Sequence, residues 1–583
     1  MNKLAALQHY FGYDAFRPYQ EEIIDNILAG QDVLAVLPTG AGKSLCFQLP
    51  AVISEGVAIV ISPLIALMQD QVAYLNQQGI RAAFINSSVA WQLIDEVLAD
   101  LNQYQLIYIA PERLVQERFL ECLKQAHISF FVIDEAHCIS QWGHDFRPEY
   151  RALQVLKKHF PNKAIAAFTA TATQTVNEDI CKQLVFKNPH KVQSSFDRPN
   201  LIIRIIERVD LHKQLLEHLT AHAEHSGIIY ASTRKAVDEL HDFLVQKGKR
   251  VTKYHAGLSE HDRTRAQRAF MNDDALIIVA TVAFGMGVHK SNIRYVIHAN
   301  MPKSIEQYYQ EMGRAGRDGL VAECTMLYHF QDLLVQKHLA KSHTGLPEKM
   351  FAFCSSLKCR RIDLLEYFSQ KYDHEQCEAC DNCLSETKVI EGTVIAQKIL
   401  SCVYRLQERF GMNYVVDVLR GSKNKNILSR GHDRLSTYGL MPECGQKELQ
   451  HYILSLIQQG FLQISQGEYP LLQFTENSRK ILKEKQTVFF REKKHAAKKA
   501  KIEPVDYDKS LFAQLSALRK KLATKAGLPP FVIFHDKTLI EICMHQPKTL
   551  PGLLEINGIG DEKLKRYGEA VLNCLVGYSK QSA

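Results

Sequence analysis

The sequence predicts an α/β fold with two parallel-sheet lobes, followed by smaller accessory domains. Short continuous apolar runs alternate with helix-length segments over residues 1–200 and again over 201–340, a pattern typical of parallel sheets that helices cover on both faces. A glycine-rich stretch, LPTGAGKS at Leu37–Ser44, follows the first apolar run. Beyond residue 340 the pattern becomes helical and basic, which predicts separate domains of another kind.

Length and composition fit a multidomain globular protein. At about 150 residues per domain, a chain of this length makes roughly four domains. Lysine and arginine (71) exceed aspartate and glutamate (63), and this mild excess permits a nucleic-acid partner. No run approaches the roughly 18 apolar residues of a spanning helix, and the N-terminus lacks a signal-peptide pattern, so we expect a cytoplasmic protein without membrane contact. The 14 cysteines are too sparse for a disulfide scaffold.

The stretch Leu37–Ser44 has the composition of a phosphate-binding loop between a buried strand and a helix. Gly40 and Gly42 let the backbone approach an anion, and the helix start adds free N–H groups. Lys43 is then in place to contact phosphates and Ser44 to bind Mg²⁺. One departure is Leu37, where the usual pattern has glycine.

The segment before this loop, Tyr10–Ile24, has two interpretations that the sequence leaves open. The first is an amphipathic helix packed on the core. The second is an adenine-binding element in which the amide of Gln20 contacts the base edge, with Arg17 and Tyr13 available for stacking.

Polar residues follow the apolar runs of the first lobe, where the chemistry of parallel sheets gathers. The strongest case is DEAH, which follows the run SFFVI about 90 residues after the loop, by the numbering of the chain. Asp134 is suited to hold Mg²⁺ and Glu135 to accept a proton from the attacking water.

The stretch DEAHCISQWGHDFRPEY, Asp134–Tyr150, is the most specific in the chain, and with it the sequence resembles the RecQ family of superfamily 2 DNA helicases, close to the bacterial type. The resemblance implies two RecA-like lobes and a loop that senses single-stranded DNA. Stacking on aromatic rings beside polar and basic groups suits that role. The loop residues are Gln141, Trp142, His144, Phe146 and Arg147. The implied ATP-binding set is Tyr13, Arg17, Gln20, Thr39, Gly40, Gly42, Lys43 and Ser44.

In the second lobe, YYQEMGRAGRDG carries Arg314 and Arg317, which the resemblance identifies as arginine fingers. Such a residue stabilises the charge transferred with the γ-phosphate. The alternative is that the two arginines share one helical face and make surface ion pairs. The neighbouring glycines favour a close backbone approach instead.

Cys359 and the stretch CEACDNC predict a structural zinc site. Two successive C-x-x-C spacings and one upstream cysteine can supply four thiolates to a tetrahedral ion. The ligands are Cys359, Cys377, Cys380 and Cys383, and the family carries a zinc subdomain here.

The remaining chain predicts DNA-binding accessory domains. Helices followed by a short hairpin at Gly460–Thr475 resemble a winged helix, in which five basic residues between Arg420 and Arg434 suit duplex phosphates. We interpret Arg491–Lys501 as a linker or exposed helix, and the helical end as an HRDC domain, where Gly558 and Gly560 either bind phosphate or shape a turn. The expected domains are 1–200 and 201–340 (lobes), 341–390 (zinc), 391–485 (winged helix), 486–507 (linker) and 508–583 (HRDC).

Together these features predict an ATP-, Mg²⁺- and Zn²⁺-dependent DNA helicase. The resemblance implies 3′-to-5′ movement on single-stranded DNA and unwinding of duplexes and junctions in recombination, repair and replication-fork processing. It also implies a monomer in the bacterial cytosol, associated with the nucleoid, with single-stranded DNA-binding protein and repair factors as partners. Two alternatives stay open: a DNA-anchoring module regulated by its ATPase, and an RNA helicase.

Overall fold

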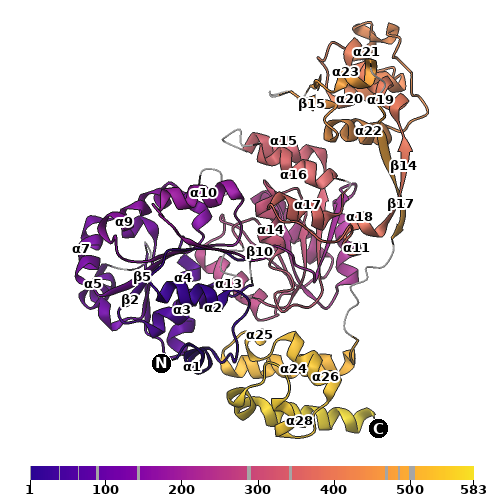
Figure 1. The fold of residues 1–583 in the computed structure, drawn as a ribbon. Coiled ribbons are helices and arrows are strands. Elements are labelled where there is room, and N and C mark those ends of the chain that lie inside the picture. The colour runs from indigo at the N-terminus through magenta and orange to yellow at the C-terminus, as the bar shows by residue number, and fades with distance from the viewer. Residues whose placement is uncertain are drawn as a thin grey trace. The chain divides into compact units, whose positions relative to one another are not determined.

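The computed structural model describes residues 2–582, apart from 39, 64, 87–88, 90, 141–144, 285–289, 340–344, 357, 466–470, 484–485 and 498–505. The chain divides into two compact units (Figure 1). The first unit comprises residues 1–350, 364–375 and 501–583, and the second comprises 351–363 and 376–500.

The first lobe is a seven-stranded parallel sheet with the strand order β3-β4-β2-β5-β6-β1-β7. Its strands are β1 (Val33–Val36), β2 (Val57–Ile61), β3 (Ala82–Ile85), β4 (Leu106–Ile109), β5 (Ile128–Ile133), β6 (Ile165–Thr169) and β7 (His190–Gln193). Its helices are α1 (Lys3–Ala6), α2 (Gln20–Leu28), α3 (Lys43–Ile53), α4 (Ile65–Gln77), α5 (Trp91–Ala99), α6 (Pro111–Leu114), α7 (Glu117–Gln125), α8 (Pro148–Arg151), α9 (Val155–His159) and α10 (Gln174–Gln183). The central strands are buried throughout, which explains their uninterrupted apolar sequences.

The second lobe is a six-stranded parallel sheet with the order β10-β11-β9-β12-β13-β8. Its strands are β8 (Leu201–Glu207), β9 (Ser226–Tyr230), β10 (Val251–Tyr254), β11 (Ile277–Ala280), β12 (Ile293–His298) and β13 (Ala322–Tyr328). Its helices are α11 (Leu211–Ala221), α12 (Arg234–Gln246), α13 (Glu260–Met271) and α14 (Ile305–Met312), and α15 (Phe330–Leu339), α16 (Leu346–Ser355) and α17 (Arg360–Tyr367) follow. The prediction of two parallel-sheet lobes is therefore confirmed.

The second unit contains a helical domain with a small hairpin. Its elements are α18 (Asp381–Leu384), β14 (Ser385–Glu391), α19 (Thr393–Arg405), α20 (Met412–Arg420), α21 (Lys425–Ser429), α22 (Gln446–Gln458), β15 (Leu462–Ile464), β16 (Leu472–Phe474), α23 (Ser478–Lys483) and β17 (Phe489–Ala497). The antiparallel pair β15–β16 is the expected short wing.

One prediction in this unit is wrong. Residues 491–497 are neither linker nor helix, because they lie in β17, which pairs antiparallel with β14. The strand begins with Phe489 and Phe490, and the Phe490 ring is buried in the same core as α19 and α22. The basic composition concealed this apolar anchor at the start of the strand.

The C-terminal domain is a helical bundle, as expected of HRDC. Its helices are α24 (Lys509–Ala526), α25 (Pro530–Ile533), α26 (Asp536–His545), α27 (Leu550–Leu554) and α28 (Asp561–Ser582). Gly558 has φ +90°, and a Cβ there would lie 2.5 Å from Oγ1 of Thr538. This close approach supports the turn-shaping interpretation of Gly558. Among the described helices, none is both long and apolar enough to span a bilayer.

Candidate nucleotide and zinc sites

The glycine-rich loop joins β1 to α3 and presents its backbone at the carboxyl edge of the first sheet. Gly40 and Gly42 have φ +92° and +85°, which other residues rarely adopt, and Gly42 caps α3. Lys43 is the first residue of that helix, followed by Ser44. The N–H groups at this helix start have the geometry that an anion site requires, and phosphate binding here stays a prediction. Thr39 lies outside the described residues.

The side chain of Gln20 is buried against this loop. Its amide nitrogen lies 3.3 Å from the carbonyl oxygen of Gly42 and donates to it, and its Oε1 accepts from the backbone N–H of Arg17 at 2.8 Å. The guanidinium of Arg17 donates to the carbonyl of Gly40 at 2.7 Å. Both side chains therefore brace the loop, while Tyr13 is half exposed and its role as an adenine contact stays a prediction.

The first of the two interpretations of Tyr10–Ile24, one amphipathic helix, is not what forms. The helical turns end at Phe11, and α2 begins only at Gln20. The intervening residues include Gly12 and Pro18, which interrupt a helix. This break places Arg17 and Gln20 beside the loop.

Asp134 directly follows β5 at the same sheet edge. Its carboxylate accepts from the hydroxyl of Ser62, which follows β2, at 3.4 Å and from the backbone N–H of Glu135 at 3.0 Å. The Tyr150 hydroxyl donates to the Asp134 carbonyl at 3.0 Å. Burial, and then the Glu135 carboxylate, raise the pKa of Asp134 to about 7, while Lys43 opposes the shift. A cation bound beside Asp134 would stabilise the ionised form of its carboxylate.

Glu135 and His137 connect the end of β5 to the end of β6. Glu135 has φ +49°, and its Oε2 lies 3.4 Å from Nδ1 of His137. The same nitrogen lies 2.9 Å from Oγ1 of Thr169, and this hydroxyl donates to the Thr171 carbonyl at 3.2 Å. The predicted base Glu135 is thus joined to residues 169–171, at the end of β6, by a short polar chain.

Arg314 and Arg317 lie in turns after α14 and not on a helix, so the interpretation as one exposed helical face is wrong. Arg314 is buried. The Cγ atom of Arg317 lies 3.8 Å from where a Cβ on Gly40 would be, so this segment of the second lobe adjoins the phosphate loop. Burial, and then Arg314 and Arg198, lower the pKa of Arg317 to about 9, which leaves its guanidinium charged at neutral pH.

Three residues that the sequence did not point out hold this arginine segment. Arg198 donates to the carbonyls of Gly313, Ala315 and Gly316 at 3.4, 3.1 and 2.9 Å. Glu311 on α14 accepts from His298 at the end of β12, with 2.7 Å between Oε2 and Nε2. No spacing pattern marks Arg198, because it acts on a segment more than a hundred residues away.

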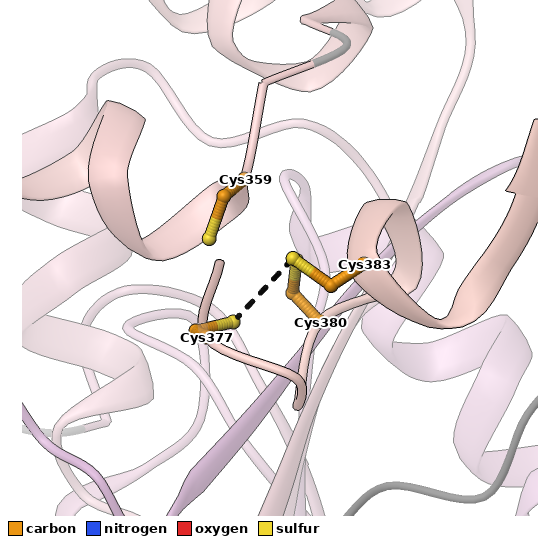
Figure 2. A group of neighbouring side chains, drawn as sticks. All are labelled: Cys359, Cys377, Cys380 and Cys383. Atoms are coloured by element: carbon orange, nitrogen blue, oxygen red, sulfur yellow. Dashed lines mark hydrogen bonds between the residues drawn. The ribbon is translucent and has the colours of Figure 1, made fainter. Parts of the chain in front are cut away.

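The four predicted zinc ligands converge in the second unit, as Figure 2 shows, with their sulfur atoms within 4.8 Å of one another. The sulfurs of Cys377 and Cys383 lie 4.0 Å apart. Zinc–sulfur bonds of about 2.3 Å give a tetrahedral edge of about 3.8 Å, so the cluster fits the ion. The backbone N–H of Arg360 donates to the Cys380 sulfur at 3.4 Å, and its guanidinium pairs with Asp381.

Comparison with known proteins agrees with this architecture. Five family models match: DEAD/DEAH box helicase (17–179), helicase conserved C-terminal domain (209–319), RecQ zinc-binding (330–384), RQC domain (386–499) and HRDC domain (508–575). "ATP-dependent DNA helicase RecQ" of Bacillus subtilis is 41% identical over 99% of this chain and 98% of its own length. The chain belongs to the RecQ family of DNA helicases.

Two further relatives are informative. "ATP-dependent DNA helicase RecQ" of Haemophilus influenzae is 42% identical over 97% of this chain and 94% of its own length. "Putative ATP-dependent RNA helicase R290" of Acanthamoeba polyphaga mimivirus is 39% identical over 80% of this chain and 89% of its own length. Membership in the RecQ family makes this chain an ATP-dependent DNA helicase with a zinc-binding domain.

The DNA-sensing loop expected of RecQ proteins is only partly described. Gln141, Trp142 and His144 lie outside the described residues. The guanidinium of Arg147 donates to the Pro63 carbonyl at 3.2 Å, and Arg151 lies over the ring of Phe146 at 5.2 Å. Arg147 therefore ties the end of the loop to the segment after β2.

Proposed function

We propose that this RecQ-family helicase moves 3′ to 5′ on single-stranded DNA and unwinds duplexes and junctions during recombination, repair and replication-fork processing. The direction and the pathways rest on the family resemblance. The observation that carries the motor mechanism is the approach of Arg317 to Gly40. It brings a cation of the second lobe to the phosphate loop of the first, so nucleotide binding can couple the two lobes.

In the first lobe, Lys43 contacts the transferred phosphates, and Ser44 and Asp134 hold Mg²⁺. Bound Mg²⁺ would neutralise charge on the β- and γ-phosphate oxygens. Glu135 takes the proton of the attacking water, and His137 orients this carboxylate from 3.4 Å. Gln20, Arg17 and Tyr13 contact adenine, which requires Gln20 to exchange its loop contacts for the base. Thr39, Gly40 and Gly42 complete the binding loop.

In the second lobe, Arg314 and Arg317 stabilise the charge that develops on the γ-phosphate. Arg198 holds their segment by three carbonyl contacts, so the arginines keep their position before nucleotide arrives. Preorganised charge of this kind lowers the barrier without reorganisation. Hydrolysis then removes the anion that both lobes share, and the lobes separate.

Single-stranded DNA acts through Gln141, Trp142, His144, Phe146 and Arg147. Because Arg147 contacts the Pro63 carbonyl beside Ser62, DNA bound to the loop can shift the group that donates to Asp134. Replacing Trp142 by alanine tests this role. Basal ATPase should remain while stimulation by single-stranded DNA falls, and full stimulation in the variant would refute it.

Cys359, Cys377, Cys380 and Cys383 hold a structural zinc ion. Apparent zinc affinities in finger peptides correspond to about 10–16 kcal/mol, so the surrounding segment depends on the metal for folding. Metal analysis should find no zinc in the Cys380→Ala variant. The control is Cys402→Ala, at a buried cysteine outside the cluster, which should keep its zinc. Zinc-free wild-type protein would contradict the assignment.

We further propose a monomer in the bacterial cytosol, at the nucleoid, that works with single-stranded DNA-binding protein and repair factors. The decisive experiment for the function is strand displacement with Lys43→Ala as the inactive control. Wild type should unwind a 3′-tailed DNA duplex with ATP, and should fail with a non-hydrolysable analogue, on a 5′-tailed duplex and on a tailed RNA duplex. Unwinding without hydrolysis would favour the anchoring alternative, and preference for RNA would favour the RNA helicase.

A further inference from the structure

A second cluster of metal-ligating side chains lies in the second lobe, within the first unit. His218 and His222 are one helical turn apart at the C-terminal end of α11, and Glu323 lies on β13. Their ligand atoms lie within 4.8 Å of one another. The side chains are 11, 19 and 14% exposed, so the cluster is largely shielded from solvent. We call it the α11 histidine cluster, and it is unrelated to the nucleotide residues described above.

The fold explains why these three residues meet. His218 lies in the last turn of α11 and His222 is the C-cap residue of that helix, and their ring centroids lie 4.6 Å apart. Glu323 pairs in register with Tyr295 of β12, and the Tyr295 ring lies 5.4 and 5.3 Å from the rings of His218 and His222. The aromatic ring gives the cluster an apolar side, which limits competition by water.

The distances between the imidazoles and the carboxylate are compatible with three ligands of one metal ion. Nδ1 of His218 lies 3.3 Å from Oε1 of Glu323, and Nε2 of His222 lies 3.6 Å from Oε2. A charge-assisted hydrogen bond spans about 2.7–2.9 Å, so both separations are long for one. They match the edge of about 3.4 Å in a tetrahedron whose bonds are about 2.0–2.1 Å. Each imidazole is therefore spaced from the carboxylate as two ligands of one ion.

The surroundings of Glu323 include one supporting and one competing group. The Thr325 hydroxyl donates to Oε1 at 3.0 Å, which orients the carboxylate as outer-shell donors do in metal sites. Nε of Arg204 lies 3.2 Å from the same oxygen. The Arg204 side chain is 41% exposed, so its guanidinium can move to solvent when a cation binds.

We propose that His218, His222 and Glu323 bind one divalent transition-metal ion of the zinc class, in a site separate from the four cysteines. Two imidazoles and one carboxylate suit Zn²⁺, Co²⁺ or Ni²⁺ and not Mg²⁺. The bound ion joins the end of α11 to β13 and stabilises the second lobe by mass action. The proposal does not depend on the direction of movement or on the DNA substrate.

The test is metal stoichiometry and thermal stability of the full-length protein with its cysteine site already loaded with zinc. Equilibrium dialysis against Co²⁺ should add one equivalent to wild type and none to the double variant His218→Ala/His222→Ala. Cobalt held by nitrogen and oxygen shows d–d bands without thiolate charge-transfer bands, which separates this site from the cysteines. The matched control is His212→Ala, an exposed histidine of the same helix that stacks on Phe243.

Two further variants sharpen the test if the double variant folds poorly. Glu323→Gln keeps the shape of the side chain and should also lose the second equivalent, and Thr325→Val should weaken Co²⁺ binding by about 10- to 100-fold. Arg204→Gln should strengthen it, because the competing cation is gone. A Co²⁺-dependent rise of the melting temperature in wild type and His212→Ala, absent from Glu323→Gln, supports the site. One equivalent of total metal in wild type, or an unchanged second equivalent in Glu323→Gln, overturns it.

Discussion

The first and second lobes share a parallel-sheet architecture but carry opposite charges at the predicted nucleotide site. The first lobe presents the adjacent carboxylates Asp134 and Glu135, and the second presents Arg314 and Arg317. Burial and the neighbouring carboxylate raise the pKa of Asp134 to about 7, whereas burial and neighbouring arginines lower the pKa of Arg317 to about 9. Each lobe therefore holds like charges that oppose one another, and neither is a complete site.

The lobes also differ in how they hold these groups. Asp134 and Glu135 directly follow the central strand β5. Ser62, after the neighbouring strand β2, donates to Asp134, and His137 links Glu135 to Thr169 at the end of β6. The arginines lie in turns after α14, where Arg198 holds the backbone of Gly313–Gly316. The comparison indicates that the sheet of the first lobe positions its two carboxylates. In the second lobe, side-chain contacts to a loop position the two arginines.

The largest expected effect comes from the second lobe. Arg317→Ala should lower kcat for ATP hydrolysis by about 10³- to 10⁵-fold, because a finger arginine acts on transition-state charge. Single-turnover hydrolysis measures this directly. The control is Arg265→Ala, an exposed arginine of the same lobe paired with Asp262, which should keep wild-type activity. If Arg317→Ala hydrolyses ATP normally, the second lobe supplies no catalytic charge.

In the first lobe, Glu135→Gln should reduce hydrolysis by about 10²- to 10⁴-fold, as expected when a general base is removed. Nucleotide affinity should change little, since Lys43 and the loop backbone remain. A fluorescent ATP analogue measures the affinity and phosphate release measures the rate. Glu121→Gln, an exposed residue of the same lobe, serves as the control. Equal losses of binding and hydrolysis would argue against Glu135 as the base.

The polar chain that runs from Glu135 through His137 to Thr169 should have a smaller effect on ATP hydrolysis. Thr169→Val removes the hydroxyl that lies 2.9 Å from Nδ1 of His137. One hydrogen bond contributes about 1 kcal/mol net, so we expect roughly a fivefold fall in DNA-stimulated ATPase. Thr264→Val, at an exposed position of α13, is the control for the same substitution. An unchanged rate in Thr169→Val would make this chain a packing feature only.

The sequence predicted those features that arise from local patterns. Continuous apolar runs identified the central strands, and the spacing of Cys377, Cys380 and Cys383 identified a cluster that the structure brings together. Edge strands were harder to predict: β7 is half exposed and has little apolar signal, and the basic residues of β17 suggested a linker. The amino-acid composition of a segment shows its charge and polarity but does not show which distant strand it pairs with.

The candidate site likewise contains residues that local motifs identified and residues that only tertiary contacts bring together. Lys43, Asp134 and Glu135 stand in recognisable local stretches and lie at one sheet edge, as predicted. Arg198 acts on a segment more than a hundred residues away, and Glu323 meets His218 only through the packing of α11 on the sheet. Contacts of this kind follow from tertiary structure and leave no local pattern.

The central claim is that the two lobes contribute opposite halves of one ATPase site. A double-mutant cycle between Glu135 and Arg317 tests it most directly, with single-turnover ATP hydrolysis measured for wild type, Glu135→Gln, Arg317→Ala and the double variant. Groups that act on the same transition state are strongly non-additive. The double variant should therefore be little slower than the slower single variant. Losses that multiply independently would contradict a shared site.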